Sequence, residues 1–173
     1  ILFSYSLLFV GIGIVSFYSG IYFLLKKDPK LILISKIGIF IAFISAVGFI
    51  LVGFTPSDKL LNQHMFVVNL AFRPFLIVML IYTYLIFRSS YISNYLSFIY
   101  LILFCLVGYY VYILMAGPAL PAVSYGQVGF FTPNKQALFF HVISQKIVIY
   151  GLSFSILCQI FFLRKKKYID LID

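Results

Sequence analysis

Hydrophobic residues form five stretches of about twenty or more residues each, and short polar segments separate them. A membrane-spanning helix needs about 20 apolar residues, whereas a strand of a transmembrane barrel needs about ten and alternates apolar with polar positions. The stretches are long and do not alternate. They predict an all-α, polytopic membrane helical bundle with five spans, in one integral membrane domain. The predicted spans are residues 1–25, 31–54, 64–87, 96–116 and 138–163.

Two of the polar segments resemble each other. The first reads Val-Gly-Phe-Thr-Pro over residues 52–56, and the second reads Val-Gly-Phe-Phe-Thr-Pro over residues 128–133. A histidine follows each proline eight residues later, at His64 and at His141. We interpret the pair as an internal repeat of a helical hairpin, with the two copies related by an axis along the membrane normal. This arrangement would bring the polar ends of both hairpins to one membrane surface.

The first polar segment contains signals for the start of a helix. Thr55 can cap a helix, Pro56 suits a first turn, and Asp58 stands where the acidic member of a capping box would lie. A helix from Pro56 to Phe87 would be about 48 Å long at ~1.5 Å per residue. Because the hydrocarbon core is only ~30 Å thick, its first turns would project into the headgroup region.

Two further patterns concern helix packing. Gly38, Ala42 and Ala46 recur every four residues, a spacing that lets helix backbones approach closely in lipid. Pro74 lies within the third span and has no amide proton, so a kink is expected where the Leu70 carbonyl loses its partner. The sequence therefore predicts one close helix contact and one local bend.

The composition changes the range of possible partners. Hydrophobic residues make up 64% of the chain and charged residues 10%, whereas soluble domains carry about 25% charged residues. The net charge of +9 does not indicate nucleic-acid binding, because the cations gather at the ends of the apolar stretches. Such positions are typical of cations that orient a protein in a membrane.

The distribution of these cations predicts an orientation. One predicted side carries Lys26, Lys27, Lys30, Lys36, Arg88 and residues 164–167, and the other carries Lys59 and Lys135. Because positive residues favour the cytoplasmic side, we predict a multi-pass protein of the cell membrane with a cytoplasmic C-terminus and extracytoplasmic Thr-Pro segments. Five spans would then leave Ile1 outside. We expect a further N-terminal helix that completes six spans.

Two cations, Arg73 and Lys146, lie well inside predicted spans, where a charge costs at least ~2.5–3.5 kcal/mol on insertion scales. Such residues often serve a binding site, although a long cationic side chain can also extend along its helix to the headgroups. At ~100° per residue, Arg73 shares a broad polar stripe with Asp58, Asn62 and Asn69.

The last span carries a comparable stripe of His141, Gln145, Ser155 and Gln159. Two such stripes predict an inward-facing pocket that opens outward, and the alternative is hydrogen bonding between helices. His64 and Lys146 point away from the stripes but lie near the same surface. The candidate ligand-binding residues are Asp58, His64, Asn69, Arg73, His141, Gln145 and Lys146.

Patterns for metal binding and catalysis are weak. His64, His141 and Asp58 could form a three-ligand site, but they come from separate hairpins and lack HExxH-type spacing. Cys105 and Cys158 have no partner at ligand spacing, so we interpret them as small buried hydrophobic residues. No G-x-S-x-G motif is present. We therefore predict no metal, no cofactor and no catalytic residue.

The segment Gly53-Phe54-Thr55-Pro56-Ser57-Asp58, followed by His64 and Ala71-Phe72, resembles the G-x-x-P-x-D…H…A-F signature of a prokaryotic family of small six-helix membrane proteins. That family is distantly similar to the eukaryotic DRAM-like proteins. The resemblance would cover nearly the whole chain, as the last five of six helices. It implies that the proline, acidic residue and histidine mark the outer end of a hairpin, and it implies no catalytic activity.

The leading functional hypothesis follows from the charges on the outer side, where Asp58 is the one acid near Arg73 and Lys146. Unpaired cations in a medium of low dielectric favour an anionic partner. We therefore expect a non-enzymatic membrane protein whose outward-facing pocket binds an anionic lipid or a protein partner. One alternative is a lipid-headgroup enzyme that uses His64 and His141 as acid and base. Others are a small transporter and a subunit of a larger membrane complex.

Overall fold

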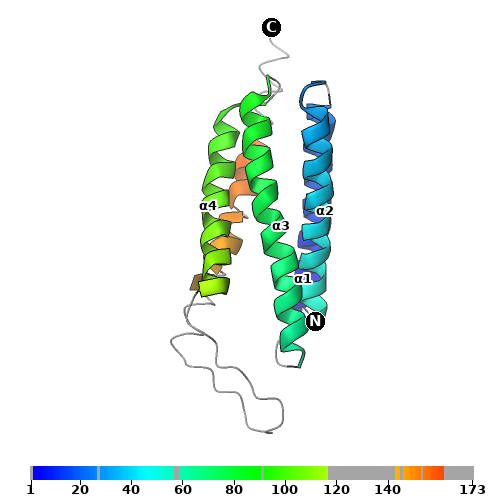
Figure 1. The fold of residues 1–173 in the computed structure, drawn as a ribbon, viewed down its shortest axis with the longest axis vertical. Helices are drawn as coiled ribbons and strands as arrows, with labels where there is room; N and C mark the ends of the chain where they lie inside the picture. The colour runs from blue at the N-terminus through cyan, green and yellow to red at the C-terminus, as the bar shows by residue number, and fades with distance from the viewer. Residues whose placement is uncertain are drawn as a thin grey trace.

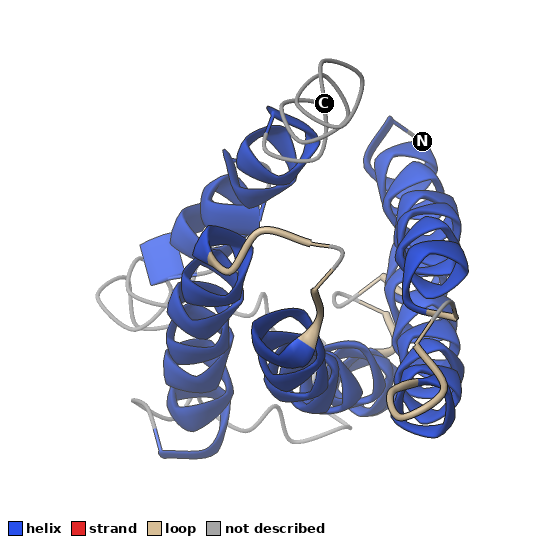
Figure 2. Ribbon diagram, turned by 90° about the horizontal axis from the view of Figure 1, so that it is seen from above, coloured by secondary structure: helices blue, strands red, loops and turns tan. Residues whose placement is uncertain are grey.

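The computed structural model describes residues 2–26, 28–56, 59–90, 92–116, 143–144, 146–152 and 154–161. Four long helices follow one another along the chain: α1 (Leu2–Leu25), α2 (Ile32–Phe54), α3 (Leu61–Arg88) and α4 (Tyr95–Ala116). Each is long and apolar enough to cross a membrane. They match the first four predicted spans to within three residues at each end. The described part of the chain consists of helices joined by loops (Figure 2).

The helices form an antiparallel bundle in which each packs on the next. α1 contacts α2, α2 contacts α3, and α3 contacts α4, so that α3 lies between α2 and α4 (Figure 1). The α1–α2 and α3–α4 connections lie at one end, which we call the cationic end because Lys26, Lys30 and Arg88 flank them. The α2–α3 connection, with Thr55 and Pro56, lies at the opposite Thr-Pro end (Figure 1).

A shorter apolar helix within residues 146–161 covers part of the fifth predicted span. It packs against α4, because a Cβ atom on Gly151 would lie 2.8 Å from Leu106 Cδ1. Val148 belongs to the same buried core as the four long helices. The second Thr-Pro segment, residues 128–133, lies outside the described residues, so the internal repeat stays a prediction.

Small residues bring α2 and α3 together, as the four-residue spacing predicts. A Cβ atom on Gly38 would lie 3.0 Å from the Tyr82 ring. Ala42 and Ala46 are each 1% exposed. The stripe is therefore buried and faces α3 at Gly38, whereas the close contact between the two backbones lies at Gly48.

Aromatic rings fill the space between α2, α3 and α4 in the half of the bundle nearer to the Thr-Pro end. The ring centroids of Phe49 and Phe72 lie 5.0 Å apart, and those of Phe72 and Tyr110 lie 4.7 Å apart. Both pairs meet edge to face, an arrangement that adds about 0.5–1.5 kcal/mol per pair beyond the burial of area. Van der Waals packing of this kind holds helices together in lipid, where apolar burial alone gives no preference for another helix.

The start of α3 differs from the prediction. Thr55 does not cap α3; its hydroxyl donates back to the Leu51 carbonyl (3.0 Å) and so completes α2. The Pro56 carbonyl accepts hydrogen bonds from the amides of Lys59 and Leu60, which form a turn before α3 begins at Leu61. The helix predicted to begin at Pro56 therefore begins five residues later. A residue before proline avoids helical geometry, and this accounts for the end of α2 at Thr55.

Pro74 lies inside α3, which continues from Leu61 to Arg88. The ring removes the amide that would bond to the Leu70 carbonyl. Gly48 of α2 packs against this same stretch, since a Cβ atom there would lie 2.7 Å from the carbonyl carbon of Leu70. The predicted bend itself stays a prediction.

Candidate functional site

The structure describes four of the seven predicted ligand-binding residues. Asp58, His141 and Gln145 lie outside the residues for which side chains are described. The half-buried His64 ring places Nδ1 2.6 Å from the Thr55 carbonyl oxygen, so Nδ1 carries the proton and donates it. This bond ties the start of α3 to the end of α2.

The side-chain amide of Asn69 also forms a local hydrogen bond. Its Nδ2 donates to the Met65 carbonyl, 2.8 Å away and one turn earlier in α3. Because the bond lies within one helix, it does not hold Asn69 toward a neighbouring helix. The amide oxygen is left to accept a further hydrogen bond.

Arg73 is exposed, and it lies on the outer surface of the bundle. It shares this face of α3 with Phe66, Ile77 and Leu80, which are 68%, 49% and 52% exposed. The inward orientation predicted for the Arg73 stripe is therefore wrong. α3 buries its other faces against α2 and α4, and only the Arg73 face is left for the surrounding lipid. Lys146 is likewise exposed.

Arg73 lies deep within its span. It is twelve residues after Leu61 and fifteen residues before Arg88. At ~1.5 Å per residue, these separations are about 18 Å and 22 Å along the helix axis. A hydrocarbon core of ~30 Å centred on α3 would therefore place the Arg73 backbone near the middle of the membrane.

No carboxylate in the described part of the chain lies near that depth. Asp28 is the described acidic residue, and it sits in the α1–α2 turn at the cationic end, where its Oδ1 accepts a hydrogen bond from the Lys30 amide (3.0 Å). Arg73 is thus a cation on an apolar surface whose nearest described acid is at the end of the bundle.

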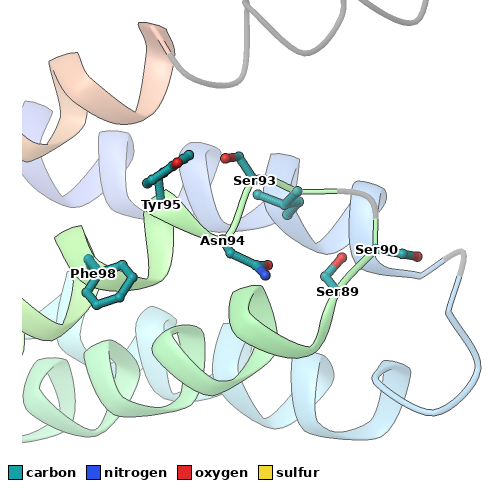
Figure 3. Close-up of a pocket in the computed structure, with 7 residues that line it drawn as sticks. Ser89, Ser90, Ser93, Asn94, Tyr95 and Phe98 are labelled. Carbon is teal, nitrogen blue, oxygen red and sulfur yellow. The ribbon is translucent and has the colours of Figure 1, made fainter.

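A small hollow lies at the cationic end, around the α3–α4 turn (Figure 3). Its volume is about 360 Å³, and its lining is mixed, with hydroxyl, amide and aromatic side chains. The lining residues are Ser89, Ser90, Ile92, Ser93, Asn94, Tyr95 and Phe98. Ser97 closes the first turn of α4 below it, through a hydrogen bond from its hydroxyl to the Asn94 carbonyl (2.6 Å). None of the predicted ligand-binding residues lines this hollow.

Four hydroxyl side chains meet in the interior nearer to the cationic end, one from each long helix. We call Tyr18, Ser35, Tyr82 and Tyr100 the hydroxyl cluster. All are buried, with exposed fractions between 0% and 4%. The ring centroids of Tyr18 and Tyr82 lie 4.5 Å apart, and those of Tyr82 and Tyr100 lie 6.0 Å apart. The hydroxyls of Ser35, Tyr82 and Tyr100 make no hydrogen bond in the structure.

Sequence reasoning missed this cluster, although a signal was present. Tyr18 lies seven residues before the end of α1, and Tyr82 lies six before the end of α3. Ser35 and Tyr100 lie three and five residues after the starts of α2 and α4. In four antiparallel spans, these spacings place a hydroxyl at nearly the same depth in every helix.

The two cysteines are free thiols. Cys105 is exposed, which contradicts the predicted burial, and Cys158 is partly exposed. A thiol is compatible with the lipid-facing surface of a membrane helix because it is only weakly polar.

No protein-family model, curated protein or solved structure matches this chain. The resemblance to the six-helix DRAM-like family therefore stays a prediction. The helices and their packing identify the chain as a multi-pass integral membrane protein of the all-α class.

Proposed function

We propose that this is a non-enzymatic membrane protein that binds the phosphate of an anionic lipid through Arg73. The observation that carries the proposal is the exposure of this arginine on an apolar face of α3, in the middle of the span. We also propose that the Thr-Pro end is extracytoplasmic and that the C-terminus is cytoplasmic.

The chemistry of the side chain supports an anionic ligand. A guanidinium group cannot lose its charge in a protein, and it presents donors in a planar fork that matches phosphate oxygens. Side chains on a helix lean toward its N-terminus, which for Arg73 is the Thr-Pro end. The group would therefore approach the lipid headgroups of that membrane surface. Pairing with a phosphate would offset the cost of the charge in low dielectric.

The depth of Arg73 favours one second candidate, a carboxylate in a span of another membrane protein. Such a carboxylate could meet the guanidinium at its own depth, whereas a lipid phosphate must be drawn inward from the headgroup layer. The neighbouring side chains of Phe66, Ile77 and Leu80 would then pack against the partner helix. Arginine–carboxylate pairs are often bidentate, which would fix the orientation of the partner.

Native mass spectrometry of the full chain, purified in mild detergent from membranes that contain phosphatidylglycerol, tests the proposal. We expect bound phospholipid in the wild-type protein and at least about a tenfold loss of it in Arg73→Ala, corresponding to ~1.4 kcal/mol of lost affinity. Arg88→Ala is the matched control, because Arg88 is an exposed arginine at the end of the same helix. It should keep the lipid.

The mass of the lost species decides between the candidates. Loss of a phospholipid mass supports the proposal, and Arg73-dependent loss of a second polypeptide supports the protein partner instead. Equal retention of all adducts by the wild-type protein and Arg73→Ala would overturn both.

A further inference from the structure

We infer that the hydroxyl cluster of Tyr18, Ser35, Tyr82 and Tyr100 is a binding site for water enclosed within the membrane-spanning bundle. The inference rests on geometry at the junction of α1, α2, α3 and α4, and it is independent of Arg73. Three of the four hydroxyl oxygens are buried and without a hydrogen-bond partner: those of Ser35, Tyr82 and Tyr100.

The hydroxyl-bearing side chains of four helices are concentrated at one place in the bundle. Tyr82 stacks on Tyr100, with 23° between the ring planes, and its other neighbour is Tyr18. Ser35 lies near the Tyr82 hydroxyl, and Tyr18 lies near that of Tyr100. By distance and angle, the Ser35, Tyr82 and Tyr100 oxygens have no hydrogen-bond partner. The hydroxyl groups therefore lie in neighbouring side chains but do not satisfy one another.

A buried hydroxyl without a hydrogen-bond partner destabilises a membrane protein more than it would a soluble protein. A buried hydroxyl in a soluble domain can regain water through small openings, but the hydrocarbon around this bundle supplies no donor or acceptor. Each hydroxyl can donate once and accept twice. A water molecule typically makes about three hydrogen bonds when buried, so one water could join three of these oxygens.

The buried surroundings of the cluster favour a small neutral ligand. Buried apolar residues lie between the cluster and the cationic end, where Ser89 and Ser97 are also buried: Leu25, Leu31, Leu85, Ile86, Ile92 and Leu96. No charged side chain belongs to the cluster, so the site offers neutral donors and acceptors alone. A small neutral molecule that bonds in several directions fits these conditions.

X-ray radiolytic footprinting of the full chain in H₂¹⁸O tests the inference. Radicals formed from a bound water attack the side chain beside it, so a buried tyrosine is labelled only where water is present. Tyr110 is the matched control, because it is a buried tyrosine of α4 packed against Phe72. We expect Tyr82 and Tyr100 to incorporate oxygen faster than Tyr110.

A second measurement uses a variant that lacks one hydroxyl of the cluster. Tyr100→Phe removes one hydroxyl and leaves the ring packing in place. In a hydrated cluster it should lower the Tm of the protein and reduce labelling at Tyr82, because a bridging water loses a partner. In a dry cluster it should raise the Tm, because an unsatisfied buried group is removed. Labelling of Tyr82 no faster than that of Tyr110, or a raised Tm, would overturn the inference.

Discussion

Gly48 of α2 packs directly on the backbone of Ala71 in α3. A Cβ atom on Gly48 would lie 2.5 Å from the Ala71 nitrogen and 2.7 Å from its Cα atom. Backbone atoms cannot move aside as a flexible side chain can, so this contact fixes how closely the two helices approach. Ala71 also lies three residues before Pro74, where α3 lacks one of its own hydrogen bonds.

Gly48→Ala should therefore destabilise the bundle, by about 1–3 kcal/mol, as overpacking of a close contact does. Thermal unfolding in detergent, followed by circular dichroism, measures the change. Gly13→Ala is the control, because a Cβ atom there meets nothing within 4 Å. The control should be neutral or gain up to about 1 kcal/mol from improved helix propensity. Equal Tm values for the two variants would contradict the close contact.

Ser45 reinforces the same junction. Its hydroxyl donates to the Ala71 carbonyl at 2.6 Å, in a buried position between α2 and α3. Ser45→Ala should cost about 0.6 kcal/mol, the average for a hydrogen bond between membrane helices, and the Tm should fall slightly. Ser16→Ala, at an exposed position of α1, should leave the Tm unchanged. A fall of the same size in both variants would mean that the Ser45 hydroxyl contributes nothing specific.

The long helices and the close contact of α2 could be predicted because lipid imposes strict demands. A span must be long and apolar, and close helix packing requires small residues. The side of each helix that faces the interior of the bundle could not be predicted in the same way. In a soluble protein the polar face of a helix meets solvent, but both the interior and the lipid around this bundle are apolar. The stripe that contains Arg73 therefore gave no sign of whether it faced a neighbour.

The start of α3 shows another limit of local signals. A threonine hydroxyl can accept a bond from the following helix or donate to the preceding one. Thr55 does the second, which ends α2, and the Pro56 carbonyl then accepts hydrogen bonds from the amides of Lys59 and Leu60 before α3 begins. The hydroxyl cluster was missed for a different reason. Its members lie on four separate helices, and their meeting depends on the rotation of each helix about its axis.

His64 provides a test of the α2–α3 connection. Its Nδ1 donates to the Thr55 carbonyl at 2.6 Å, and that carbonyl stands at the end of α2, where a helix leaves carbonyls unpaired. His64→Phe keeps a ring but removes the donor, and it should cost about 0.5–1.5 kcal/mol in unfolding experiments. Gln63→Ala, at the exposed position beside it, should have no effect. If His64→Phe matches the wild-type Tm, the bond does not stabilise the turn.

Arg73 offers a test that separates a functional residue from a structural one. Arg73→Leu replaces the charge by an apolar side chain on a face that already carries Phe66, Ile77 and Leu80. Membrane insertion of α3 should become more favourable by at least ~2.5–3.5 kcal/mol, the cost assigned to arginine at the centre of a span. A glycosylation-based insertion assay on the full chain measures this change, with Leu80→Ala as a control on the same exposed face. The same variant should lose the Arg73-dependent ligand. Easier insertion together with ligand loss means that Arg73 is retained for binding, whereas poorer insertion would mean that the arginine itself supports the fold.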